Sequence, residues 1–338
     1  MARVLSALVI VAVAVGLAVI AWPQLLGIQR EAIVVQVTTL RGLLTALALV
    51  LAVFFTLVAL VWSGSRRFAG AIALLLLVFA GVQLAVLATR GAGTDGFQTK
   101  APGDLTVVAW NTLGDAPGVE AIAELALGAD ADVVVLPETS ADTARQVAAA
   151  MAVGGASMQV LVVAYDEIAK SRSTAVLIST ELGEYRVDDS VGNTETLPSV
   201  VAVPVDGTGP TIVGAHPVAP VPGEMSSWRQ GLDWLAERCA GDDVIVAGDL
   251  NSTLDQYQGL DAASDATGGL GGCRDAARLS GAAAVGTWPA ILPPLLGAPI
   301  DHVLATDRWD VVGFRVDSSR DGSGSDHRPV IALLRPAG

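Results

Sequence analysis

The sequence predicts an α/β domain of packed β-sheets that three apolar helices attach to a membrane. The first 90 residues contain a single acidic residue, Glu31, and hold three apolar stretches long enough to cross a bilayer. Beyond residue 104, short apolar runs alternate with turn residues and with few helical patterns. Many strands with few helices favour packed sheets flanked by helices over a simple doubly wound sheet.

The three apolar stretches carry no charged side chain, whereas tryptophan or arginine stands near their ends, where such residues favour the membrane interface. They span Val4–Trp22, Leu43–Trp62 and Phe68–Thr89. With 52% hydrophobic residues the whole chain is too apolar for an ordinary soluble domain, and this excess is concentrated here. The first stretch could instead be a signal peptide, but no small-residue cleavage site precedes Pro23 and two further spans follow.

Residues 91–103 are predicted to form a flexible linker, because glycine dominates Gly91–Gly96 and no apolar pattern continues through it. We therefore expect residues 1–90 to form a membrane region. Residues 104–338 have the size of one α/β domain.

Within this domain we expect strands wherever a short apolar run lies between turn residues. The predicted strands are Leu105–Trp110, Asp132–Leu136, Gln159–Ala164, Thr174–Ser179, Ser199–Val205, Thr211–Ala215, Asp243–Ala247, Ile300–Ala305, Val311–Val316 and Pro329–Leu334. The predicted helices are Val119–Leu127, Ala141–Met151 and Met225–Cys239. The apolar, proline-rich loop Leu292–Leu296, with Trp288 before it, is expected to be plain loop packing, although it could also touch lipid or line a site.

The domain is strongly acidic. Six of the 20 Lys and Arg residues lie in the first 90 positions, so residues 91–338 hold 14 of them against 33 Asp and Glu, a net charge of −19. Such a surface repels polyanions and lacks the basic run on which non-specific nucleic-acid binding depends, so no strong nucleic-acid-binding surface is expected. Genome composition explains the bias equally well, and a small phosphate substrate stays compatible with it.

All three histidines of the chain stand beside aspartate or at the polar end of an apolar run. They are His216 after Thr211–Ala215, His302 after Asp301, and His327 after Asp326. A single histidine after a strand is more often structural, but the recurrence of the pattern points to a common site.

Read in chain order, polar residues end a whole series of predicted strands. The series is Trp110-Asn111, Pro137-Glu138-Thr139, Ala215-His216, Gly248-Asp249-Leu250-Asn251, Ile300-Asp301-His302 and Ser325-Asp326-His327. Over roughly residues 104–336 it resembles the endonuclease/exonuclease/phosphatase superfamily, which has the DNase I-like fold. The Gly-Asp-Leu-Asn and Ser-Asp-His elements are the most specific parts of the resemblance. The membrane region lies outside it.

The resemblance implies a four-layer, two-sheet α/β sandwich with the site at one rim. It also implies hydrolysis of phosphodiesters or phosphomonoesters with Mg²⁺ or Mn²⁺. The implied roles are that Asp301 orients His327, that Asp249 and Asn251 orient or deprotonate the attacking water, and that His216 donates to a phosphate oxygen. Whether Asp249 or His327 is the general base stays open.

A hard divalent cation prefers oxygen ligands, few of them from protein. Glu138, at the end of an apolar run, is the best single ligand, and Asn111 and Asp326 could complete or buttress the site. Arg172 and Lys170 precede a segment that lies near the phosphate in relatives, and Arg172 is the candidate substrate contact, although a solvated loop fits them equally well.

Other residues have weaker assignments. His302 stands where relatives often carry Tyr or His and is expected to be structural. No clear carboxylate partner for His216 is visible, and Glu195 and Glu224 are only candidates. Cys239 and Cys273 could pair in a non-cytosolic domain or remain two buried thiols.

The charges beside the spans favour an exterior domain. Arg3, Arg66 and Arg67 lie on one side, against Arg30, Arg41, Arg90 and Lys100 on the other. The totals do not decide, but the Arg66-Arg67 pair sits in a very short loop, where such charges count most. A multi-pass protein of the cell membrane with an extracytoplasmic domain is therefore expected, and a Cys239–Cys273 disulfide would agree.

Three functions follow from these expectations. The first is a membrane-anchored, metal-dependent phosphohydrolase acting on a lipid- or envelope-linked phosphate. The second is an extracellular nuclease that cleaves DNA or RNA, against which the acidic surface argues. The third is an inactive binding module, against which the complete residue series argues.

Overall fold

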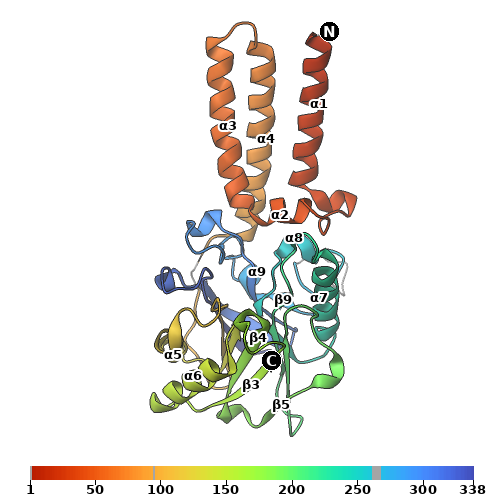
Figure 1. Cartoon of the computed structure of the whole chain (residues 1–338). Helices are drawn as coiled ribbons and strands as arrows, with labels where there is room; N and C mark the ends of the chain where they lie inside the picture. Colours follow the sequence, from red (N-terminus) through yellow and green to blue (C-terminus); the bar gives the residue numbers. More distant parts are fainter. Residues whose placement is uncertain (1, 94–95, 261–267) are drawn as a thin grey trace.

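The computed structural model describes residues 2–93, 96–260 and 268–338 and consists of an elongated helical region above a two-sheet domain (Figure 1). The helical region contains α1 (Ala2–Ala21), α3 (Arg41–Val61) and α4 (Arg66–Arg90). Each is long and apolar enough to cross a membrane, so the three predicted spans are confirmed as helices. A 3₁₀ turn, η1 (Pro23–Leu26), and the short helix α2 (Val34–Thr39) connect α1 to α3.

The N-terminal end of α1 and the α3–α4 connection lie at the end of the helical region that points away from the domain (Figure 1). Helices α3 and α4 pack side by side along most of their length, with Ala48, Ala52, Ile72 and Ala80 buried between them. The connection that contains α2 lies at the opposite end, against the domain.

The domain contains two six-stranded mixed sheets. The first sheet runs in the order β11 (Trp309–Val316), β12 (Val330–Pro336), β1 (Leu105–Ala109), β2 (Val133–Pro137), β4 (Ser173–Ser179) and β3 (Met158–Ala164). The second runs in the order β5 (Tyr185–Val187), β6 (Val200–Pro204), β7 (Thr211–Ala215), β8 (Val244–Asp249), β10 (Asp301–Ala305) and β9 (Arg274–Asp275).

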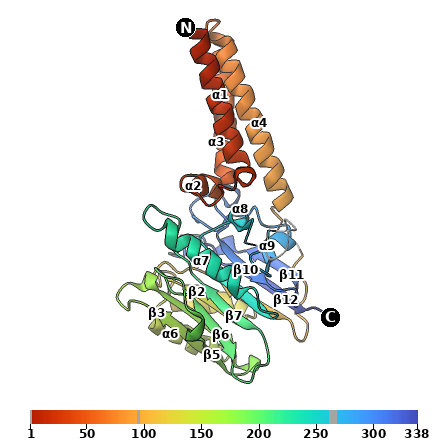
Figure 2. The ribbon, with the colours of Figure 1, turned by 90° about the vertical axis from the view of Figure 1, so that its right-hand side faces the viewer.

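The period-two alternation of each strand separates three apolar clusters and so produces four layers. In β1, Val107 faces the core between the sheets, whereas Val108 faces outward toward α5 (Gly118–Gly128) and α6 (Ala141–Val153). On the other side, Val213 and Val246 of the second sheet pack against α7 (Met225–Arg238) (Figure 2). The expected four-layer sandwich is therefore confirmed.

Parallel pairing brings the polar strand ends to one rim. Strands β1 and β2 run parallel, so the residues that follow them, Asn111 and Glu138, leave the first sheet side by side. Strands β7 and β8 are also parallel, which places His216 next to Asp249. Asp301, the first residue of antiparallel β10, pairs directly with Asp249. Strand topology therefore gathers residues that are as much as 190 positions apart, from Asn111 to Asp301.

Every strand predicted from the sequence is present, with ends shifted by at most two residues. The predictions missed β5 and β9, which are too short to show an apolar run. They also missed the one-turn helices α8 (Leu254–Tyr257) and α9 (Ala276–Leu279) and the helix α2. Side-chain caps at Thr253 and Asp275 start α8 and α9, and such short helices carry little periodicity to recognise.

The described part of the predicted linker makes backbone hydrogen bonds to the domain. The amide of Gly93 donates to the carbonyl of Gly281 at 3.0 Å, and the amide of Gln98 donates to Val312 at 3.1 Å. Gly91 has φ +74°, and a Cβ there would lie 2.0 Å from the carbonyl oxygen of Gly281, so only glycine fits this approach. The segment is thus held at more points than a free tether would be.

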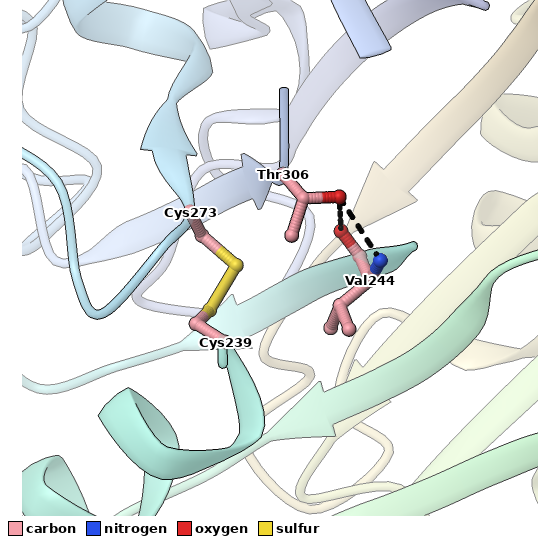
Figure 3. The surroundings of a disulfide bond; sticks show 4 residues. All are labelled: Cys239, Val244, Cys273 and Thr306. Carbon is pink, nitrogen blue, oxygen red and sulfur yellow. Dashed lines mark hydrogen bonds between the residues drawn. A yellow bond between two sulfur atoms is a disulfide. The ribbon is translucent and has the colours of Figure 1, made fainter. Parts of the chain in front are cut away.

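Cys239 and Cys273 are joined by a disulfide, with their Cα atoms 5.4 Å apart (Figure 3). Cys239 ends α7, and Cys273 directly precedes β9 at the edge of the second sheet. Nearby, the amide of Val244 in β8 donates to the hydroxyl of Thr306, which follows β10. The disulfide therefore ties the outer helix to the sheet in which β8 ends at Asp249 and β10 begins at Asp301.

Candidate active site

Glu138 occupies a strained backbone position at the rim. Its backbone φ angle is +56°, a value that residues other than glycine rarely adopt. The hydroxyl of Thr112 donates to the Glu138 carbonyl at 2.9 Å and holds the backbone in this conformation. The strain turns the carboxylate toward Asn111 instead of continuing the strand, and strain of this kind clusters at functional sites.

Asn111 links two carboxylates. Its Nδ2 atom donates to Oε1 of Glu138 at 3.1 Å and to Oδ2 of Asp249 at 3.0 Å. Its Oδ1 atom accepts from the amide of Leu113 at 3.0 Å, which fixes the side of the amide that faces the carboxylates. In this arrangement Asn111 positions Glu138 and Asp249, and its predicted role as a metal ligand stays a prediction.

Asp249 is buried and receives several donors. The amide of Asn251 donates to Oδ1 at 2.9 Å, and Nδ2 of Asn251 lies 3.3 Å from Oδ2 and 3.0 Å from the carbonyl of Pro217. Asn251 also has a positive φ, +45°. Gly248 must be glycine, because its φ is +139° and a Cβ would meet the carbonyl oxygen of Ala215 at 2.2 Å. The Gly-Asp-Leu-Asn motif is thus a tight turn that aims one carboxylate and one amide into the site.

His327 lies between two aspartates. Its Nδ1 atom is 2.9 Å from Oδ2 of Asp301, and its Nε2 atom is 3.8 Å from Oδ2 of Asp249. The indole of Trp110 donates to the His327 carbonyl at 2.9 Å, and the hydroxyl of Thr287 accepts from the amide of Asp301 at 3.2 Å. These contacts lock the histidine and its aspartate in one geometry.

Burial and neighbouring charge shift the pKa values of these groups in different directions. Burial alone would lower the pKa of His327, but Asp301 and Asp249 together raise it strongly. Burial raises the pKa of Asp249, an effect that the nearby His327 partly offsets. Burial likewise raises the pKa of Glu138, against the hydrogen bond from Asn111. The pKa values of these three groups are therefore all higher than those of the same side chains in water.

His216 is fully buried, and its environment keeps it neutral. Burial, with a smaller contribution from His327, lowers its pKa to about 3. Its Nδ1 atom lies 3.5 Å from the hydroxyl of Thr174, while Nε2 lies 3.8 Å from Oε1 of Glu138 and has no hydrogen-bond partner among the described residues. The candidate partner Glu224 accepts from Thr196 instead, and no contact joins Glu195 to His216 in the described chain.

Asp326 reaches the same cluster from the loop before β12. Its Oδ1 atom is 3.9 Å from Nε2 of His327, and its Oδ2 atom accepts from the indole of Trp288 at 2.9 Å. Trp288 therefore belongs to the site, and the loop that contains it does more than pack. The side chain of Asp326 is 42% exposed, so it stands at the open side of the cluster.

Some sequence candidates lie outside the cluster. His302 is buried between Asp275, at 2.7 Å, and the carbonyl of Ser252, at 2.9 Å, which agrees with a structural role. Lys170 pairs with Asp115 at 3.0 Å. Arg172 lies over the ring of Tyr165 in the 3₁₀ turn just before β4, and its contact with substrate stays a prediction.

The residues present fit a divalent cation. Asp249, Asp301 and His327 offer ligand atoms that lie within 4.8 Å of one another. With Glu138 and Asp326 included, the cluster contains four carboxylates around the imidazole of His327. Within the described chain, Oδ1 of Asp301 and Oδ1 of Asp326 are buried without a hydrogen-bond partner. A hard cation such as Mg²⁺ binds to oxygen ligands, and these two carboxylate oxygens are available to it.

Sequence reasoning missed the residues that position this cluster. They are Thr112, Thr174 and Thr287, whose hydroxyl groups bond to the backbone or side chains of the site residues. Ser325, which belongs to the Ser-Asp-His motif, donates to the carbonyl of Asn111. A threonine or serine near a strand end has no distinctive signal in a single sequence, because the same residues serve ordinary turns.

A two-sheet sandwich with buried carboxylates, histidines and asparagines at one rim defines a class of metal-dependent hydrolase for phosphoric esters. The family model described as "Endonuclease/Exonuclease/phosphatase family" matches residues 108–327. The chain therefore belongs to this family, whose members are metal-dependent phosphoric ester hydrolases. No curated protein sequence matches the chain significantly.

Solved structures share the fold at low sequence identity. TDP2 from C. elegans is 15% identical, with a TM-score of 0.50 over 84% of this chain and 92% of that chain. D. rerio TDP2 complexed with a single-strand DNA product is 14% identical, with a TM-score of 0.50 over 69% and 99%. An endonuclease/exonuclease/phosphatase from Beutenbergia cavernae is 21% identical, with a TM-score of 0.48 over 70% and 72%.

Proposed function

We propose that this protein is a membrane-anchored phosphohydrolase that acts, outside the cytoplasm, on a phosphate ester carried by a lipid or by a lipid-linked envelope component. The observation that carries the proposal is the direct connection between the catalytic turn and the membrane helices. Asp255 lies four residues beyond Asn251 and pairs with Arg41 and Arg90 at 2.8 and 2.7 Å. Arg41 begins α3 and Arg90 ends α4, so the rim that bears the site faces the membrane region.

A second loop of the site faces the same way. Trp288, which donates to Asp326, lies in the loop that continues to η5 (Pro294–Leu296). The backbone of Leu295 in this turn comes so close to Gly42 of α3 that a Cβ on Gly42 would overlap its carbonyl oxygen. In the same loop Ile291 is 90% exposed. An exposed apolar side chain beside membrane helices favours contact with lipid.

The side chains of the chain itself can perform the parts of a hydrolysis. Asn251 would align the attacking water, either Asp249 or His327 would accept its proton, and neutral His216 would donate from Nε2 to a phosphoryl oxygen. Asp301 would hold His327 in one orientation. Glu138, with Asn111 and Asp326, would hold the divalent metal, which would supply charge neutralisation at the phosphoryl group.

Two features support an exterior domain. The Cys239–Cys273 disulfide is typical of proteins in oxidising compartments. The Arg66-Arg67 pair begins α4, at the end of the helical region opposite the domain (Figure 1), and basic residues in short loops favour the cytoplasmic side.

Labelling tests this orientation. Reduced intact cells under mild denaturant should react with a membrane-impermeant thiol reagent at Cys239 and Cys273. Protection until the membrane is broken would place the domain inside.

The substrate is tested with the full-length protein in lipid nanodiscs with Mg²⁺ or Mn²⁺. The panel should contain a lipid phosphomonoester, a phospholipid, a soluble chromogenic phosphodiester, plasmid DNA and RNA. The His327→Ala variant identifies contaminating activity. We expect the lipid phosphates to be hydrolysed in preference to the soluble esters. Faster cleavage of DNA or RNA than of every lipid would instead make the protein a nuclease.

A further inference from the structure

A separate cavity of about 320 Å³ lies between the membrane helices and the domain. Trp22 and Gln24 line it from the α1–α2 connection, Arg41 from α3, Val86 and Arg90 from α4, and Arg278 from α9. Cavities of this size hold small-molecule ligands in other proteins. No residue of the catalytic cluster lines it, so it is distinct from the site described above.

The cavity lies at the depth where the membrane helices end. Helix α1 ends at Ala21, α3 begins at Arg41 and α4 ends at Arg90, and all three residues line it. Trp22 is 50% exposed, and tryptophan at a helix end favours the boundary between acyl chains and headgroups. A ligand in this cavity would therefore stand at the level of lipid headgroups.

The cavity carries excess positive charge. Its described lining contains the arginines 41, 90 and 278 but only one carboxylate, Asp255. Asp255 is 2% exposed; burial would raise its pKa, but Arg90 and Arg41 lower it far below the usual range, so it is ionised. Three guanidinium groups against one carboxylate give this described lining a net charge of about +2, which attracts an anion.

Arg41 is more fully paired than the other two arginines. Its Nε and Nη2 atoms bond to Asp255, and Nη1 bonds to Gln83 and to the carbonyl of Ala21, which leaves one N–H of Nη2. The Nη2 atom of Arg90 pairs with Asp255, and the Nη1 atom of Arg278 donates to the carbonyl of Thr89. Among the described residues these two side chains make no other hydrogen bond. Their remaining guanidinium donors can form the bidentate pairs that arginine makes with phosphate.

We propose that this cavity binds the phosphate of an anionic phospholipid, held by Arg90 and Arg278 against the half-exposed ring of Trp22. Basic pockets between membrane helices bind phospholipid headgroups for the same electrostatic reason. Bound lipid would brace α8, which carries Asp255 and follows the catalytic turn. The proposal concerns a resident lipid and does not depend on the identity of the substrate.

The test uses the full-length protein, delipidated in a neutral detergent. Native mass spectrometry and thermal-shift titration should compare phosphatidylglycerol, phosphatidylcholine and inorganic phosphate. We expect phosphatidylglycerol to bind at least tenfold more tightly than phosphatidylcholine. The Arg278→Gln variant should weaken phosphatidylglycerol about tenfold, because one charged hydrogen-bonding group is lost.

Arg229→Gln is the matched control. Arg229 bonds to the carbonyl of Arg30 and to Glu31 at the same junction but does not line the cavity, so its loss should leave lipid affinity unchanged. A photoactivatable phosphatidylglycerol on the unmodified protein gives a measurement without any variant, and it should label the segment near Trp22 and the end of α4.

Equal binding of both lipids, unchanged affinity in Arg278→Gln, or labelling confined to the outer faces of α1 and α3 would each overturn the proposal. Inorganic phosphate that binds as tightly as phosphatidylglycerol and depends on Arg278 would show a site for free phosphate and would also overturn it.

Discussion

The Nδ1 atom of His327 lies 2.9 Å from Oδ2 of Asp301, and the imidazole thereby directs Nε2 toward Asp249 at 3.8 Å. Asp301 pairs with Asp249 across the β8–β10 ladder, so the same register that joins the strands also sets the spacing of the two carboxylates. The histidine reaches this pair from a different sheet, in the loop before β12. The contact between the two sheets therefore decides whether the three groups meet.

If Asp301 acts through His327, the two side chains form one functional unit. Asp301→Asn and His327→Ala should each lower the hydrolysis rate severely, and the double variant should be little worse than the worse single variant. A double-mutant cycle on kcat measures the coupling. Rate losses that add in the logarithm would mean that the two residues contribute independently.

Glu138→Gln preserves shape but removes a charged oxygen ligand. We expect activity to fall by more than the roughly 10- to 100-fold typical for loss of an outer-shell partner of a metal site. Higher Mg²⁺ or Mn²⁺ should restore part of it, because weaker metal binding contributes to the loss. Glu124→Gln, an exposed change on α5, is the control. Normal turnover in Glu138→Gln, or full activity in EDTA, would contradict the metal assignment.

Neutral His216 should make the protein sensitive to acid. Its folded pKa of about 3 lies below the unfolded value of 6.5, so between these values the unfolded chain binds the extra proton. Stability from this residue is therefore present above pH 6.5 and is lost as the pH falls, at up to about 1.4 kcal/mol per pH unit.

The change His216→Gln removes the titration and should flatten this dependence. Thermal unfolding of both full-length proteins in detergent and EDTA, at pH 7 and pH 4.5, measures the difference. Parallel losses in the two proteins would show that His216 does not titrate in this way.

The disulfide should stabilise the domain by about 3–4 kcal/mol, because it closes a loop with a sequence separation of 34 in the unfolded chain. Mild reductant should lower the unfolding temperature of the natural protein. A variant with serine at both Cys239 and Cys273 should have a lower unfolding temperature without reductant, and reductant should not change it. An identical response of both proteins to reductant would show that the bridge contributes nothing.

Much of the architecture follows from local pattern. Apolar length predicts the three membrane helices, and short apolar runs between turn residues predict the longer strands, because both signals depend only on neighbouring residues. The polar strand ends, from Asn111 to His327, are likewise visible as motifs. Elements without periodicity, such as α8 and β9, are invisible because caps and sheet contacts stabilise them instead.

Contacts between segments that are distant in the sequence could be identified only from the tertiary structure. The amide of Asn111 bridges Glu138 and Asp249 only because two sheets pack face to face. Trp288 joins the site through Asp326, and Arg41 and Arg90 converge on Asp255, although nothing in the spacing of these residues relates them. A sequence pattern records which face a residue presents, whereas the partner on the opposing face depends on how whole sheets and helices pack.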